Sequence, residues 1–190
     1  RPHIIRDLEL PKHGLEILPL ECSFAPAVDG PGLCRWPSSE RTYNEIARYS
    51  QRDASRYPEF GKEMALLSRF IKPLIDSDAP DPTSLSPSEL MRMAKLGKPI
   101  RDMSPRKLHQ LLKMMTMSAV DFLDEWFESD VLKAPMAVSG IIGTFLGVRS
   151  PGTAYVLLHH YMGEIDGAMR AWGFARGGTG GISMAIAKAA

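Results

Sequence analysis

The chain has 190 residues, with 23 Lys and Arg against 22 Asp and Glu, so its formal net charge is +1. This balance argues against a nucleic-acid-binding protein, which needs a concentrated basic face. Hydrophobic residues make up 44% of the chain, as in an ordinary globular domain, and Cys22 and Cys34 are too few for a disulfide framework or a four-cysteine zinc site.

Residues 1–38 are predicted to be rich in β-structure. Leu15–Leu20 alternates imperfectly between apolar and polar residues, and Gly32–Trp36 forms a second short run after the turn at Val28–Pro31. We expect these two runs to pair as an antiparallel hairpin, with Pro19 on an edge.

Residues 39–190 are predicted to be mainly helical. Ser50 and Asp53 have the spacing of a capping box at the start of a long helix. Apolar residues then recur at steps of three and four, as on a helix face that packs against a core. They are Tyr57, Phe60, Met64, Leu67, Ile71 and Leu74.

Further helix starts are predicted at Ser-Pro pairs and at a second capping box. The pairs are Ser86-Pro87, Ser104-Pro105 and Ser150-Pro151, and the box is Ser118 with Asp121. The chain therefore predicts an α+β fold in which a small antiparallel sheet is covered by a helix-rich layer. We expect a single domain over residues 1–190.

The segment Ala134–Val148 is uncharged and has 15 residues, too few to span a membrane. It is typical of a buried helix or of the wall of an apolar cavity. Gly140, Gly143 and Gly147 interrupt it, each at a cost of about 1 kcal/mol relative to alanine inside a helix. We expect the close approach of another helix or of a flat ligand to offset that cost.

The adjacent pair His159-His160 suggests a metal site, but its spacing does not favour one. Neighbouring side chains on a helix point about 100° apart, whereas zinc-binding helices use a four-residue step. We expect a packed or cavity-lining pair and no metal. The acidic stretch from Asp121 to Asp130 is interrupted by Trp126 and Phe127, as on the solvated face of a half-buried helix.

A glycine-rich turn, Arg176–Gly181, precedes a helical Ala-rich segment. Such a turn exposes backbone N–H groups toward an anion or a carbonyl group. It does not match the dinucleotide fingerprint, because Ser183 stands where the third glycine is needed. The chain begins without Met and closes on Met184–Ala190 without a helix stop signal, so we expect a piece of a longer chain.

Four stretches together resemble the phytoene-dehydrogenase-like flavoproteins, a family that includes the carotenoid desaturases and a pyridine nucleotide-disulfide oxidoreductase domain-containing branch. The stretches are Arg1–Leu8 with His13–Leu15, Glu125–Ser129, Ser150–Tyr155 with Leu158–His160, and Ala171–Phe174 running into Arg176–Gly180. Thr179 departs from the family, which commonly has Met after the glycine pair. The resemblance covers the whole chain in order.

The resemblance implies a parent enzyme that uses FAD to oxidise or desaturate a hydrophobic substrate, with the flavin taking the hydride. The resemblance further implies that this chain corresponds to the substrate-binding domain, without the FAD-binding Rossmann parts of the family. We therefore expect the isolated chain to be inactive and not to hold FAD tightly.

The resemblance also directs the choice of site residues. The expected apolar lining of a substrate cavity is Ile141, Ile142, Phe145, Leu146 and Trp172. The candidate catalytic groups, which could relay a proton, are Tyr155, His159 and His160. The residues expected to approach the flavin or to fix the cavity rim are Gly177, Gly178 and Gly180.

The expected partners are the missing FAD-binding domain of the same chain and a hydrophobic small molecule, with no nucleic acid. A homo-oligomer and a peripheral membrane contact stay open. Low cysteine use and the lack of a signal sequence favour the cytoplasm. The alternative is a helical module without catalysis, in which the stripe from Tyr57 to Leu74 and the segment Ala134–Val148 face a protein or lipid partner.

Overall fold

The computed structural model describes residues 2–165, 168–169 and 172–190. The first part of the chain forms α1 (Pro2–Asp7), the 3-10 helix η1 (Leu10–His13), β1 (Ile17–Pro19), β2 (Ser23–Ala25), β3 (Leu33–Arg35), α2 (Ser39–Ala47) and α3 (Gln51–Asp76). The middle forms α4 (Pro87–Arg101), α5 (Pro105–Thr116), α6 (Ala119–Asp124), α7 (Asp130–Ala137), the 3-10 helix η2 (Val138–Gly140) and α8 (Thr153–His160). The last part forms β4 (Glu164–Ile165), β5 (Ala168–Met169), β6 (Gly173–Ala175) and α9 (Thr179–Ala189). The predicted helix-dominated α+β class is confirmed.

The described strands pair as three two-stranded antiparallel sheets, β1 with β6, β2 with β3 and β4 with β5. The hairpin predicted between Leu15–Leu20 and Gly32–Trp36 is wrong. Residues 33–35 pair instead with the nearer residues 23–25, because a local turn closes a hairpin at a smaller entropic cost.

The strand β1 pairs with β6 from the other end of the chain, so that Leu18 lies opposite Phe174. A Cβ atom on Gly173 would lie 2.7 Å from the Leu18 carbonyl oxygen, so this close pairing requires glycine. The opening residues are also not extended as expected, because they form α1 and η1.

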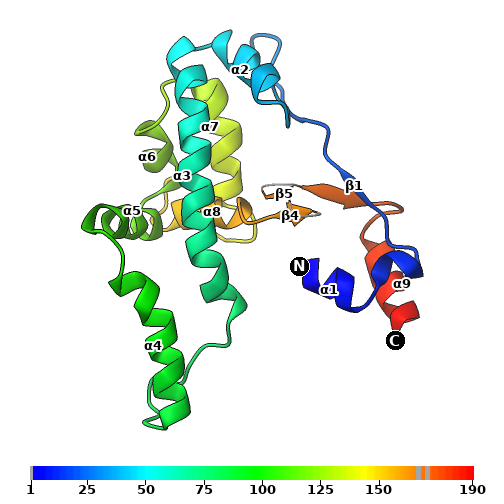
Figure 1. Ribbon diagram of the computed structural model, residues 1–190. Coiled ribbons are helices and arrows are strands. Elements are labelled where there is room, and N and C mark those ends of the chain that lie inside the picture. The colour runs from blue at the N-terminus through cyan, green and yellow to red at the C-terminus, as the bar shows by residue number, and fades with distance from the viewer. Residues whose placement is uncertain (1, 166–167, 170–171) are drawn as a thin grey trace.

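A helical body, formed by α2 to α8, contains the larger hydrophobic core (Figure 1). The predicted stripe on α3 faces this core: Phe60, Met64, Leu67 and Ile71 are buried, and Tyr57 and Leu74 pack beside them. The ring of Phe60 is the centre of an aromatic cluster. Its neighbours, with centroids 5.1 to 6.0 Å away, are Phe122, Trp126, Phe127 and Tyr161.

Three of the predicted serine caps are confirmed by hydrogen bonds. The hydroxyl oxygens of Ser50, Ser86 and Ser118 each accept from the backbone N–H three residues later, which satisfies a donor that the helix start leaves unpaired. The helix expected at Ser150-Pro151 begins later, at Thr153, because Gly152 adopts a left-handed conformation with φ of 82°.

The segment Ala134–Val148 is not the continuous buried helix that its composition suggests. The helix α7 ends at Ala137, η2 follows, and turns continue beyond Gly140. Gly143 has a φ of 79°, which ends regular helix. A Cβ atom on Gly140 would lie 2.7 Å from the Cβ of Ala119, so the close approach expected at this glycine is confirmed.

A separate terminal subdomain consists of α1, η1, β1, β6 and α9 and holds both chain ends (Figure 1). Its small core contains Leu10, Leu15 and Ala185. An ion pair between Glu16 and Arg176 joins its first and last parts, with one N–O distance of 2.9 Å. The hydrogen bond from Arg176 lowers the pKa of Glu16.

A buried carboxylate ties the start of α3 to the turn between α6 and α7. The two oxygens of Asp53, a fully buried residue, accept from the backbone N–H groups of Glu128, at 2.9 Å, and Ser129, at 2.8 Å. The Ser50 hydroxyl donates to the Glu128 carboxylate at 2.7 Å. This bond, followed by the hydrogen bond from Arg52, lowers the pKa of Glu128.

Replacing this carboxylate should be costly. Asp53→Ala leaves two backbone donors unpaired in a buried place, so we expect the free energy of unfolding to fall by about 3 kcal/mol. Asp53→Asn, which keeps one acceptor oxygen, should lose less. The matched control is Asp78→Ala, because the Asp78 side chain is 95% exposed. Urea denaturation measures all three, and an Asp53→Ala variant as stable as the control would contradict this role.

Candidate functional site

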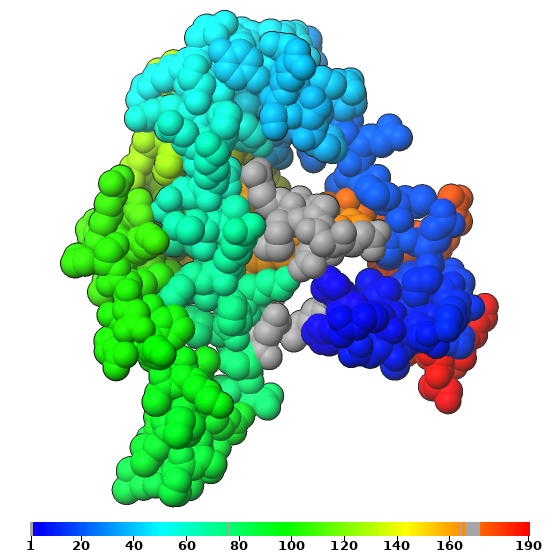
Figure 2. Space-filling view, in the orientation of Figure 1, coloured from blue at the N-terminus to red at the C-terminus, as the bar shows by residue number. Residues whose placement is uncertain are grey.

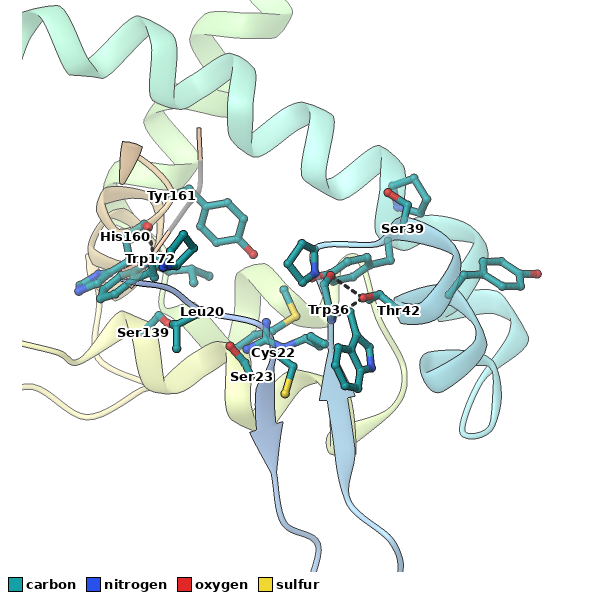
Figure 3. A pocket seen from close by; sticks show the side chains of 18 of the residues that line it. Leu20, Cys22, Ser23, Trp36, Ser39, Thr42, Ser139, His160, Tyr161 and Trp172 are labelled. Atoms are coloured by element: carbon teal, nitrogen blue, oxygen red, sulfur yellow. Dashed lines mark hydrogen bonds between the residues drawn. The ribbon is translucent and has the colours of Figure 1, made fainter. Parts of the chain in front are cut away.

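A cavity of about 670 Å³ opens between the helical body and the β2–β3 hairpin (Figure 3). Its volume lies in the range of small-molecule binding sites. In Figure 2, α2 and the start of α3 form the cyan upper part of the molecule, and the terminal subdomain lies apart at the lower right. The residues that line the cavity range from Pro19 to Trp172, so its wall draws on segments far apart in the sequence.

Most of the side chains that line the cavity are apolar or aromatic. They are Pro19, Leu20, Trp36, Pro37, Tyr43, Ala54, Tyr57, Pro58, Met136, Ile142, Leu157, Tyr161 and Trp172. The remaining lining residues are polar or charged: Cys22, Ser23, Arg35, Ser39, Thr42, Ser139 and His160. Such a mixture suits a ligand with an apolar skeleton and a few polar groups.

The hydroxyl of Thr42 fixes Trp36 at the cavity edge. Buried on α2, it accepts from the Trp36 backbone N–H at 2.7 Å and donates to the Trp36 carbonyl oxygen at 2.8 Å. The Arg41 guanidinium covers one face of the indole, 3.4 Å from its centroid. The end of β3 is therefore anchored to α2, and its side chains are held in place.

His160 lies at the opposite side of the cavity and stacks on Trp172 (Figure 3). The ring centroids are 5.5 Å apart, with an angle of 7° between the planes, and the Trp172 indole N–H donates to the His160 carbonyl oxygen at 3.3 Å. The Nδ1 atom of His160 lies 2.8 Å from the Val156 carbonyl oxygen. Because a carbonyl oxygen can only accept, Nδ1 carries the proton in the neutral ring and Nε2 is the acceptor.

The structure brings three of the sequence-predicted residues to the cavity, namely Ile142, Trp172 and His160. Tyr155 packs against the helical core, and His159 is exposed and does not line the cavity, although its ring centroid lies 5.8 Å from that of His160. Three of the predicted apolar lining residues lie in the turns after η2 and do not line the cavity: Ile141, Phe145 and Leu146. Phe145 is fully exposed.

The glycines expected to approach a flavin lie in the terminal subdomain. Gly177 and Gly178, with φ of 79° and 85°, form the turn between β6 and α9, and Gly180 follows in the first turn of α9. All three are exposed and none lines the cavity. The described strands are all antiparallel, unlike the parallel sheet that binds dinucleotides. The described residues therefore do not fit a FAD site.

Sequence reasoning missed the hairpin side of the cavity. The sequence analysis did not assign Trp36, Tyr161 or Arg35 to a binding site, and it assigned Tyr57 only to the core. These four residues come from three separate segments, so no local pattern could have grouped them. The cysteines were expected near strands, and Cys34 does lie in β3, with its sulfur 4.0 Å from that of Cys22. Burial, followed by the contact with Cys22, raises the pKa of the Cys34 thiol.

Two further findings concern the described part of the chain. It contains no group of three or more His, Cys, Asp or Glu side chains that could hold a metal ion. None of the helices within it combines the length and apolar character needed to cross a lipid bilayer.

The fold and the cavity define a helix-dominated α+β protein with a site of small-molecule size. Its sequence is similar to the "Pyridine nucleotide-disulfide oxidoreductase domain-containing protein 2" of Rattus norvegicus and of Mus musculus, each 34% identical over 204 residues. Each match covers the whole of this chain but 35% of the relative, so the chain spans about a third of the length of these curated relatives. No protein-family model and no solved structure matches the chain. The predicted similarity to this named branch is confirmed.

The hydrogen bond of His160 predicts an unusual tautomer. In the neutral form, we expect His160 to carry its proton on Nδ1, because Val156 accepts it there. The exposed neighbour His159 is an internal control. Long-range proton–nitrogen NMR correlations distinguish the two tautomers, and a neutral His160 protonated on Nε2 would contradict the geometry.

Proposed function

We propose that this chain is the substrate-binding part of a FAD-dependent oxidoreductase that dehydrogenates or desaturates a hydrophobic substrate, in the manner of the phytoene-dehydrogenase-like enzymes. The observation that carries the proposal is the cavity of about 670 Å³ with its mainly apolar and aromatic wall. The similarity to relatives named as oxidoreductases supports the reaction class.

In this proposal the chain binds and orients the substrate and excludes water. The rings of Trp36, Tyr57 and Trp172 supply large apolar contact areas. The unprotonated Nε2 of His160 accepts a hydrogen bond from a polar group of the ligand. The redox chemistry belongs to a FAD-binding domain outside this chain, so a titration with FAD should give no saturable change in flavin fluorescence.

Exposed apolar side chains on and beside α4 support a companion domain as a partner. This helix projects from the helical body (Figure 1) and has no buried residue. Leu85, Leu90 and Met91 are 84%, 46% and 60% exposed, and apolar surface of this kind marks contacts with other surfaces. A second copy of the chain, or a peripheral membrane contact in the cytoplasm, would use the same surface.

The same exposed side chains favour a second candidate function, a helical protein- or lipid-interaction module without catalysis. Such a module needs no ligand in the cavity. It would self-associate or bind vesicles through α4, and sedimentation velocity at increasing protein concentration would detect the self-association.

Binding of a neutral apolar probe tests the proposal against this alternative. We expect decan-1-ol to bind the purified chain in isothermal titration calorimetry. Ile142→Glu should weaken this binding about ten-fold or more, because it places a charge in the apolar wall. Ile142 is 49% exposed, so the variant should still fold.

The matched control is Phe145→Glu, three residues further on and outside the cavity wall. It should bind decan-1-ol like the parent chain. No binding by the parent chain, or equal losses in both variants, would contradict the proposed function. Self-association without probe binding would favour the interaction module.

A further inference from the structure

The cavity wall contains one formally charged side chain among the described residues that line it. Arg35 at the end of β3 is that residue, and no Asp, Glu or Lys lines the cavity with it. Its side chain is half-buried. The cavity therefore combines an apolar wall with a single positive charge.

The guanidinium of Arg35 makes no hydrogen bond or ion pair with any residue that the structure describes. Other arginines of the chain are paired within the protein: Arg52 binds the Glu128 carboxylate at 2.9 Å, and Arg176 binds Glu16. A partly desolvated guanidinium without a counter-charge is costly, because it gives up hydration and gains nothing in exchange. An anion in the cavity would supply the missing partner.

The position of Arg35 is fixed by its surroundings. It lies opposite Ser23 in the β2–β3 ladder, and the next residue, Trp36, is held by both hydrogen bonds of Thr42. The Arg41 guanidinium, stacked on Trp36, adds a second positive charge at this edge. Trp36, the residue directly after Arg35 of β3 and the ring under Arg41, lies across the cavity from His160 and Trp172 (Figure 3).

We propose that the cavity takes an amphipathic ligand whose oxyanion head group, a carboxylate or a phosphate monoester, pairs with Arg35. This inference rests on the proposed function and specifies its substrate class. The planar guanidinium matches either head group with two parallel hydrogen bonds. The apolar body of the ligand extends from Arg35 along Tyr57, Met136 and Leu157 toward Trp172.

Three ligands with the same ten-carbon chain test the proposal. They are decanoate, decyl phosphate and decan-1-ol, titrated into the purified chain by calorimetry at about pH 8, where the carboxyl group is ionised. We expect at least one of the two anions to bind about ten-fold more tightly than the alcohol, because charge-assisted hydrogen bonds are the stronger ones. The tighter anion identifies the head group.

Variants assign the preference to the guanidinium. Arg35→Met should remove the advantage of the anion and leave the affinity for decan-1-ol unchanged, and Arg35→Lys should keep part of the advantage. The matched control is Arg106→Met, at an exposed arginine of α5 outside the cavity wall, which should keep the full advantage.

The outcomes separate the two proposals. Equal affinities for the anions and the alcohol, or an advantage that survives Arg35→Met, would overturn the head-group assignment while leaving the apolar cavity intact. Absence of binding by all three ligands would overturn the proposed function as well.

Discussion

The buried carboxylate of Asp53 is the interaction on which the arrangement of the helical body depends. Two backbone N–H groups at the end of the α6–α7 connection, directly before α7, both donate to this one side chain. Because Asp53 lies in the first turn of α3, these hydrogen bonds fix the start of α3 against the start of α7. Met136 on α7, and Tyr57 and Pro58 on α3, then line one cavity.

The other side of the cavity depends on a smaller set of contacts. Thr42 holds the end of β3 against α2, and Trp172 packs its indole on His160. The β2–β3 hairpin and α8 are thereby fixed on opposite sides of one space. The aromatic rings in this wall are large and rigid, so they can bury a ligand at a small entropic cost. The polar groups Arg35 and His160 differ in chemistry, a guanidinium and an imidazole, and under the proposal an anionic head group pairs with Arg35.

The proposed separation of substrate binding from cofactor binding rests on two features of the described residues, the cavity and the position of the glycine-rich turn. The glycine-rich turn before α9 lies in the terminal subdomain, away from the cavity, and the described strands offer no parallel sheet for a dinucleotide. The proposed function accordingly gives substrate binding to this chain and cofactor binding to a companion domain. The relatives from rat and mouse, about three times as long as this chain, have room for both.

Local signals in the sequence predicted much of the fold. The serine caps at Ser50, Ser86 and Ser118 and the apolar stripe on α3 depend on neighbours within a few residues, and each is found in the structure. Non-local features were missed. The pairing of β1 with β6 joins opposite ends of the chain. The sequence of a three-residue strand does not indicate which other strand it pairs with.

The candidate site shows the same limit. Ile142 was found because it stands in a conspicuous apolar stretch, whereas His160 and Trp172 were found through the histidine pair and the family resemblance. Phe145 stands in the same stretch as Ile142, but the glycine-rich turns carry its ring into solvent. Arg35 was missed because a single arginine in a short strand gives no signal until the structure shows that none of the described residues pairs with it.

The most direct test of the cavity as the binding site uses the tryptophans, of which the chain has three. Trp36 and Trp172 line the cavity, whereas Trp126 lies beside a separate space of about 220 Å³. In a proton–nitrogen NMR spectrum, saturation with the apolar probe should move the indole N–H signals of Trp36 and Trp172 and leave that of Trp126 in place. A shift confined to Trp126, or no shift of any indole signal, would contradict the account.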